Sequence, residues 1–410
     1  MAGTLHRAIL IASLLLTASA SAQSTRAEIF ADIDRHLSEL SEMTGLKPRR
    51  AVPAEIITRE KVNQFLQQRI KEVATPEELR AEELMLKKFG LAPADFDLVK
   101  TTIDLLTEQA AAFYDYHRKR LYLTDWTSSE TQQAALVHEL AHALADQHFN
   151  LERFVKQAGK NDDTALARLA VAEGQASWLM SEHLARKMGL SLRGSLATLE
   201  MMSRAAEALP GQYPIFDQAP LYLRETLIFP YLKGMLFQHA VYEKMGAAAF
   251  SQIFRRPPVS TQQILHPEDY LAGKAPSSPA LPEVPDKRKY KDLIGGTIGE
   301  LDHAILLRQY VGKERAAEVA PHWRGGQYTI FEARADKRAV LTYSSDWDEP
   351  RVARDFFHHY AEVLRQKWKR MQVTGETTDR ISGQGDDGYF VLKLNGSTVS
   401  SLEGLPQPVR

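Results

Sequence analysis

The stretch Val137–Phe149, VHELAHALADQHF, carries two histidines four residues apart, His138 and His142, with Glu139 directly after the first. On an α-helix this spacing places both imidazoles on one face, where they can reach a single metal ion. Glu139 then lies beside the first ligand, where a carboxylate can take a proton from metal-bound water. This HExxH pattern is typical of zinc hydrolases, so we expect Zn²⁺ as the cofactor.

A catalytic zinc site needs a third protein ligand. Our first choice is Glu173, which lies 31 residues after His142 on a separate predicted helix, 164–188. The alanines around it make a solvated face less probable than a buried one. The neighbouring Gly174 and Ala176 are small and would let two helices approach closely.

Three other residues compete for a place at the site. His148 follows His142 by six residues, the metzincin spacing, but Ala145 stands where a glycine must turn the helix, so a continuing helix points His148 away. Asp146 is either an acid that orients His142 through its second imidazole nitrogen or a plain surface acid. His183 is expected to be structural.

Two residues are candidates for stabilising the negative charge that develops on a substrate carbonyl oxygen. His266 precedes Pro267 in an irregular segment, and loops reach clefts more often than helix faces do. Tyr231 offers a phenol hydroxyl. We therefore predict Glu139, His266 and Tyr231 as catalytic residues and His138, His142 and Glu173 as metal ligands.

The fold class predicted around this motif is α+β and mainly helical. Residues 112–114 and 121–123 are β-prone runs around a polar turn, which predicts a hairpin. Thr127–Glu130 reads as a capping box that starts the HExxH helix. Beyond a segment rich in Pro, Ser and Ala, runs at 327–333, 339–344 and 388–394 predict strands, and 349–371 predicts a helix.

These patterns divide the chain into four parts. Residues 1–22 have a charged start, an apolar run and an Ala-Ser-Ala end, which predicts a signal peptide cleaved after Ala22 and a secreted or periplasmic protein. Residues 23–273 form the predicted metallopeptidase domain, 274–289 a linker, and 290–410 a smaller α+β accessory domain of unassigned role.

The composition and net charge limit the classes of molecule that the chain is expected to bind. The chain of 410 residues has a net charge of −1 and a pI of about 6.9, so nothing drives it towards nucleic acid. After signal cleavage we expect no stable insertion into a membrane. The absence of cysteine excludes disulfides and thiolate ligands, so the core alone must stabilise an exported chain.

The hairpin, the HExxH helix and the later helix bearing Glu173 resemble the gluzincin, or thermolysin-like, metallopeptidases. HELAHALADQHF, AEGQA and STQQILHP also resemble a family of uncharacterised bacterial secreted proteins classed with the metallopeptidases. The first resemblance implies that an edge strand at Ala112–Tyr114 binds extended peptide. One position departs from that group, because Ser177 stands where an acid often follows the ligand glutamate by four residues.

The favoured function is therefore an exported zinc-dependent peptidase acting on a peptide or protein substrate. The alternative is a non-catalytic zinc-binding envelope protein that holds a partner in the groove. A third hypothesis is a helical envelope protein in which the motif is fortuitous. Glu139 favours catalysis, because a structural zinc site does not require a carboxylate at that position.

Overall fold

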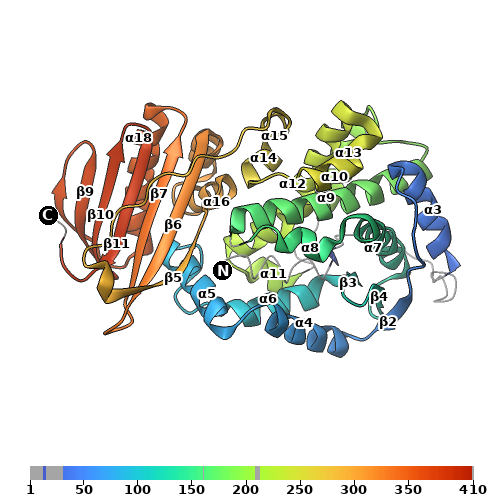
Figure 1. Cartoon of the computed structure of the whole chain (residues 1–410), viewed down its shortest axis with the longest axis horizontal. Helices are drawn as coiled ribbons and strands as arrows, with labels where there is room; N and C mark the ends of the chain where they lie inside the picture. Colours follow the sequence, from blue (N-terminus) through green and yellow to red (C-terminus); the bar gives the residue numbers. More distant parts are fainter. Residues whose placement is uncertain (1–12, 15–30, 160, 208–212, 409–410) are drawn as a thin grey trace.

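The computed structural model describes residues 13–14, 31–159, 161–207 and 213–408 of the chain. A seven-stranded sheet lies at one end of the molecule, and a helical region around a smaller sheet lies at the other (Figure 1). The predicted fold class, α+β and mainly helical, is confirmed. Apart from residues 13 and 14, the predicted signal peptide lies outside the described residues. None of the described helices has the length and apolarity needed to cross a bilayer.

The smaller sheet contains the predicted hairpin. Its strands are β1 (Ser13–Leu14), β2 (Ala54–Ile57), β3 (Ala110–Asp115) and β4 (Arg120–Thr124), in the order β1-β3-β4-β2. The hairpin strands β3 and β4 pair antiparallel, as predicted. The other edge of β3 pairs antiparallel with β1, with Ser13 opposite Ala112. This edge therefore has backbone groups placed to receive an extended segment.

Three long helices form the centre of the helical region. They are α7 (Ser129–Phe149), which holds the HExxH motif, α9 (Asp162–Lys187) and α12 (Leu221–Met245). The surrounding helices are α3 (Ile33–Thr44), α4 (Arg59–Val73), α5 (Pro76–Phe89), α6 (Leu98–Gln109), α8 (Leu151–Lys156), α10 (Leu196–Glu207), α11 (Pro214–Gln218), α13 (Ala249–Arg255), α14 (Thr261–Leu265) and α15 (Pro267–Ala272).

The start of α7 differs from the prediction by one residue. Ser128, not Thr127, is the N-cap, and its hydroxyl accepts a hydrogen bond from the Thr131 backbone N–H. The Thr127 hydroxyl is instead 3.0 Å from that of Thr124 at the end of β4. The contact with the hairpin thus moves the cap one residue along the chain.

Helices α9 and α12 touch through glycine. A Cβ atom added to Gly174 would lie 2.1 Å from the carbonyl carbon of Gly234. The predicted close approach at Gly174 is therefore present, but it brings α9 against α12. Because a side chain at either glycine would push the two backbones apart, this contact sets how α12 lies over α9.

The larger sheet is antiparallel throughout, in the order β5-β6-β7-β11-β10-β9-β8. Its strands are β5 (Tyr290–Gly296), β6 (Trp323–Ala333), β7 (Ala339–Trp347), β8 (Gln372–Glu376), β9 (Arg380–Gly385), β10 (Gly388–Asn395) and β11 (Thr398–Leu405). The associated helices are α16 (Glu300–Tyr310), α17 (Lys313–Val319) and α18 (Pro350–Lys367). Sequence patterns predicted β6, β7, β10 and α18 but missed β5, β8, β9 and β11.

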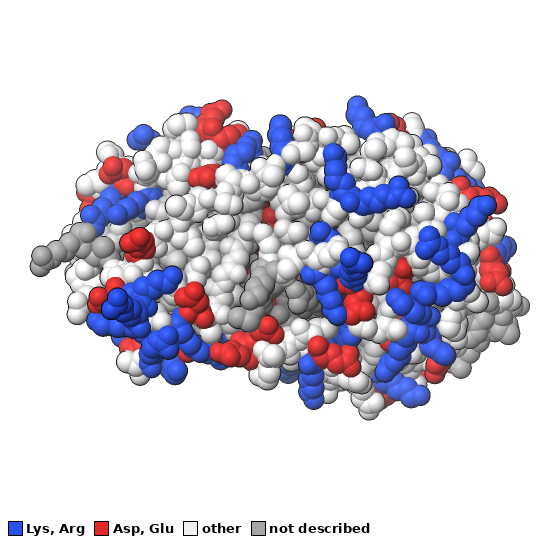
Figure 2. Space-filling model, viewed as in Figure 1, with Lys and Arg blue, Asp and Glu red and all other residues white. Residues whose placement is uncertain are grey.

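The two regions share one hydrophobic core. Phe89, the last residue of α5, is fully buried and meets the rings of Tyr328 and Tyr343 from the larger sheet at 5.4 and 5.6 Å. The predicted linker lies against the sheet, where Thr342 donates a hydrogen bond to the Pro282 carbonyl. The domain boundaries themselves stay predictions. On the face in Figure 2, basic and acidic side chains lie close to one another over both halves.

Candidate metal centre

The HExxH side chains lie inside the molecule. His138 is 0% exposed, Glu139 1% and His142 6%, because α7 packs between the small sheet on one side and α9 on another. Leu136, Leu140 and other apolar residues of α7 are buried too, so the helix has no wide solvent face. A buried imidazole or carboxylate needs a partner for its polar atoms.

Three ligand atoms from two helices form a nearly equilateral triangle. The Nε2 atom of His138 lies 3.1 Å from Nε2 of His142 and 3.1 Å from Oε2 of Glu173, and His142 Nε2 lies 3.2 Å from the same oxygen. Two ligand atoms on a tetrahedral zinc ion are about 3.4 Å apart. The spacing therefore fits one small cation, and Glu173 lies close to both imidazoles.

The electrostatics of this triangle favour a cation at its centre. Burial alone would raise the pKa of Glu173, but attraction to His142 and hydrogen bonds from both imidazoles lower it to about 2. Burial would lower the pKa of His142, but the Glu173 carboxylate outweighs it and the pKa rises. Glu173 is therefore ionised at neutral pH, and His142 is placed where positive charge is stabilised.

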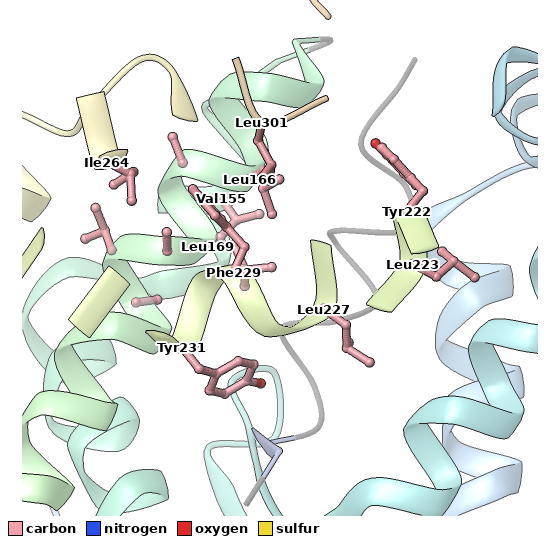
Figure 3. Close-up of a cluster of buried hydrophobic side chains, with 14 of the residues drawn as sticks. Val155, Leu166, Leu169, Tyr222, Leu223, Leu227, Phe229, Tyr231, Ile264 and Leu301 are labelled. Atoms are coloured by element: carbon pink, nitrogen blue, oxygen red, sulfur yellow. The ribbon is translucent and has the colours of Figure 1, made fainter. Parts of the chain in front are cut away.

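Tyr231, predicted from sequence as a catalytic residue, lies beside this group of side chains. Its ring packs over that of His138, with centroids 6.0 Å apart and planes 26° from parallel. Figure 3 shows Tyr231 pointing away from the group of Leu166, Leu169 and Phe229. The Nδ1 atom of His138 is buried and makes no hydrogen bond with any described residue, so packing against Tyr231 helps to hold that ring.

The structure does not support a role for His266 at this centre. Its Nε2 atom lies 2.9 Å from Oε1 of Glu300 on α16, and this bond raises the pKa of His266. His266 directly follows the last residue of α14. The first residue of that helix, Thr261, donates a hydrogen bond to Asp163 in the first turn of α9. Glu173 follows Asp163 by ten residues, which is about 15 Å along a helix. His266 thus joins α14 to the C-terminal region.

Asp146 does not orient His142. Its carboxylate accepts hydrogen bonds from Tyr114, from Lys119 and from the Leu151 backbone N–H, and Arg50 lies 3.3 Å away. It is buried, but it faces the hairpin rather than the imidazole. Asp146 therefore fastens the end of α7 to the β3–β4 turn.

The remaining candidate histidines, His148 and His183, have different surroundings. His148 lies on a continuous helix, as predicted, with Nε2 2.8 Å from the Lys47 carbonyl oxygen. His183 belongs to a second group, with His36 and Glu39 of α3, that the sequence analysis missed. The signal for this group was present as a histidine and a glutamate three residues apart, but their partner lies far along the chain.

Two family models match parts of the chain. Residues 94–192 match a peptidase family described as an IrrE N-terminal-like domain, and residues 237–409 match a domain of unknown function (DUF8575). No curated protein and no solved structure matches the chain.

The first match spans β3 to α9 and includes His138, Glu139, His142 and Glu173. It points to a metallopeptidase-like domain. The residues present could hold a metal ion. Tyr231 and His266 lie outside this match.

Proposed function

We propose that this chain is an exported zinc-dependent peptidase that uses Glu139 as its general base. The observation that carries the proposal is the triangle of His138, His142 and Glu173, whose ligand atoms lie 3.1–3.2 Å apart in a buried site. Hydrogen bonds alone explain this arrangement poorly, because if both imidazoles donated to Glu173 their two N–H groups would meet across the 3.1 Å contact between the Nε2 atoms. The match to a peptidase family over the same residues supports it.

A divalent zinc ion held here would polarise a substrate carbonyl and lower the pKa of a bound water. The protein side chains then have separate tasks. Glu139, next to His138 on α7, accepts the proton of the attacking water and passes it to the leaving amine. Tyr231 donates a hydrogen bond to the carbonyl oxygen as negative charge develops there. Glu173 and the two imidazoles hold the ion.

The substrate is expected to bind as an added strand on the edge of β3 that pairs with Ser13 and Leu14, in place of those residues once the predicted signal peptide is removed. The antiparallel pairing of Ser13 and Leu14 with this edge supports that mode, since it involves the same backbone groups that an extended peptide would use. β3 packs against α7, so a peptide on its edge would run close to the HExxH helix. Of the two imidazoles, His142 is the more exposed, which favours approach from its side. Export rests on the predicted signal peptide.

The test combines metal analysis with an assay on a mixture of unstructured polypeptides. Glu173→Ala should lose the ion from this site together with turnover, whereas Glu139→Gln should keep the ion and lose turnover. Glu152→Gln, at a partly exposed position on the neighbouring helix α8, is the matched control. A wild-type protein that holds zinc but cleaves no peptide would favour the alternative, an envelope protein that retains a partner. A protein that holds no metal would overturn both.

A further inference from the structure

A second group of metal-binding side chains lies where α3 meets the C-terminal end of α9. His36 and Glu39 stand three residues apart on one face of α3, and His183 comes from α9. The Nδ1 atom of His183 lies 3.0 Å from Oε2 of Glu39, and that of His36 lies 3.4 Å from the same oxygen. The two imidazole rings meet edge to face with centroids 4.9 Å apart.

We propose that His36, Glu39 and His183 form a second binding site for one divalent transition-metal ion, with zinc as the expected occupant. Two imidazoles and a carboxylate form a recurring protein ligand set for zinc. The two spacings of 3.0 and 3.4 Å lie close to the ligand–ligand distance of about 3.4 Å expected around a tetrahedral zinc ion. Glu39 is partly exposed, with 32% of its side chain accessible, so water can reach this group.

Arg35 prepares Glu39 for this role. Its guanidinium lies 3.0 Å from Oε1 of Glu39, which leaves Oε2 directed at the two rings. Metal binding through Nδ1 places the ring proton of His36 on Nε2, which is 3.5 Å from Arg35. Arg35 is half exposed and also pairs with Asp32 at 2.9 Å, so it can turn towards Asp32 when that proton arrives. Arg35 in this orientation would not block the site.

The second site is separate from the first. Glu173 and His183 are ten residues apart on α9, which is about 15 Å along the axis, well beyond the separation of ions in a two-metal catalytic centre. The expected effect of an ion at the second site is to hold helices together. The ion would clamp α3 to α9, and the chain leaving α3 reaches α7, where the Arg49 and Arg50 backbone N–H groups donate to Gln147.

The experiment counts metal in the full chain. Protein stripped with a chelator is dialysed against buffered zinc and analysed for zinc per chain. We expect two equivalents in the wild type, one in His183→Ala, one in Glu173→Ala and none in the double variant. His148→Ala should keep two, because His148 belongs to neither group and its Nε2 atom lies 2.8 Å from a backbone carbonyl oxygen. A wild type that binds one equivalent, lost in Glu173→Ala and kept in His183→Ala, would overturn the second site alone.

Two further measurements guard against misfolded variants. Glu39→Gln keeps the shape of a partly exposed side chain, and with a native circular dichroism spectrum it should also lose one equivalent. In the Glu173→Ala background, zinc should still raise Tm, and adding His183→Ala should abolish that rise. Retention of the full zinc content in both Glu39→Gln and His183→Ala contradicts the proposal. Neither measurement depends on peptidase activity, so failure here is distinguishable from failure of the proposed function.

Discussion

Two histidine–glutamate groups, one between α7 and α9 and the other between α3 and α9, differ most in how far their side chains are exposed to water. At the first, His138, His142 and Glu173 are all buried, with the glutamate 2% exposed. At the second, the side chain of Glu39 is 32% exposed, while His183 is buried. Burial strengthens each electrostatic interaction at the first group, whereas water weakens those of Glu39.

The neighbours of the two groups differ as well. Glu139 follows His138 directly and supplies an acid beside the ligands, whereas Arg35 and its ion pairs surround Glu39. The match to the peptidase family includes every residue of the first group but only His183 of the second. The comparison shows that histidine and glutamate side chains form two groups whose surroundings differ, and we propose a different role for each. A buried site with a carboxylate beside it suits catalysis, which is the role proposed for the first group. A partly exposed site between α3 and α9 suits holding two helices together, which is the role proposed for the second.

The largest expected effect tests the chemical half of this comparison. Glu139→Gln removes the general base while preserving the size of the side chain, so kcat should fall about a thousandfold. Zinc content should be unchanged, since Glu139 is not a proposed ligand. Steady-state kinetics and metal analysis on the same preparation check this. Normal peptide hydrolysis by the variant would remove the catalytic assignment of the first group.

A third set of acids, at the first turn of α9, tests whether buried carboxylates on this helix always imply a metal. Burial raises the pKa of Asp163 to about 7, although Thr261 donates hydrogen bonds to it. A raised carboxyl pKa favours folding at low pH, and that contribution is lost as pH rises from about 4 through about 7. The metal-free wild type should therefore lose stability over this range, since no bound ion has to leave for the Asp163 carboxyl to ionise.

Asp163→Asn keeps the acceptor for Thr261 and removes the titration. At pH 8 the variant should be more stable than the wild type, by at most about 4 kcal/mol, with little difference at pH 4. Denaturant unfolding at the two pH values measures this. An equal gain at both values would show that charge at Asp163 is not the cause.

A smaller effect is expected from the tyrosine that packs on His138. Tyr231→Phe keeps the ring contact and removes the hydroxyl, so kcat should fall about a hundredfold with little change in KM or zinc content. His266→Ala is the comparison variant, because His266 bonds to Glu300, and its kcat should stay within a few-fold of the wild type. A larger fall in kcat for His266→Ala than for Tyr231→Phe would support a catalytic role for His266 instead.

The smallest predicted effect concerns the support of both groups by α9. Gly174→Ala places a methyl group against the Gly234 backbone and should destabilise the fold by about 2 kcal/mol, since the two helices must separate. Gly375→Ala, on the exposed strand β8, is the control. Thermal unfolding of both variants, with and without zinc, measures the difference. Equal stability of the Gly174→Ala and Gly375→Ala variants would mean that α12 can move away from α9 at little cost in free energy.

The HExxH helix and the hairpin were predictable because their signals are local. Spacing of four along one helix fixes the relation of His138 to His142, and two β-prone runs with a polar turn fix β3 and β4. The strands β8 and β9 were missed for the opposite reason. β8 is exposed along its whole length and β9 contains two glycines, so neither has the apolar alternation that signals a strand.

The sequence by itself predicted the candidate ligands on α7, the proposed base beside them and the helix that carries Glu173. Only the tertiary structure decided that Glu173 closes the triangle, that Tyr231 and not His266 stands next to it, and that Asp146 serves the hairpin. It also joined His183 to α3. Helical periodicity specifies which side chains share a face, but which faces meet depends on contacts between distant segments, such as that of Gly174 with Gly234.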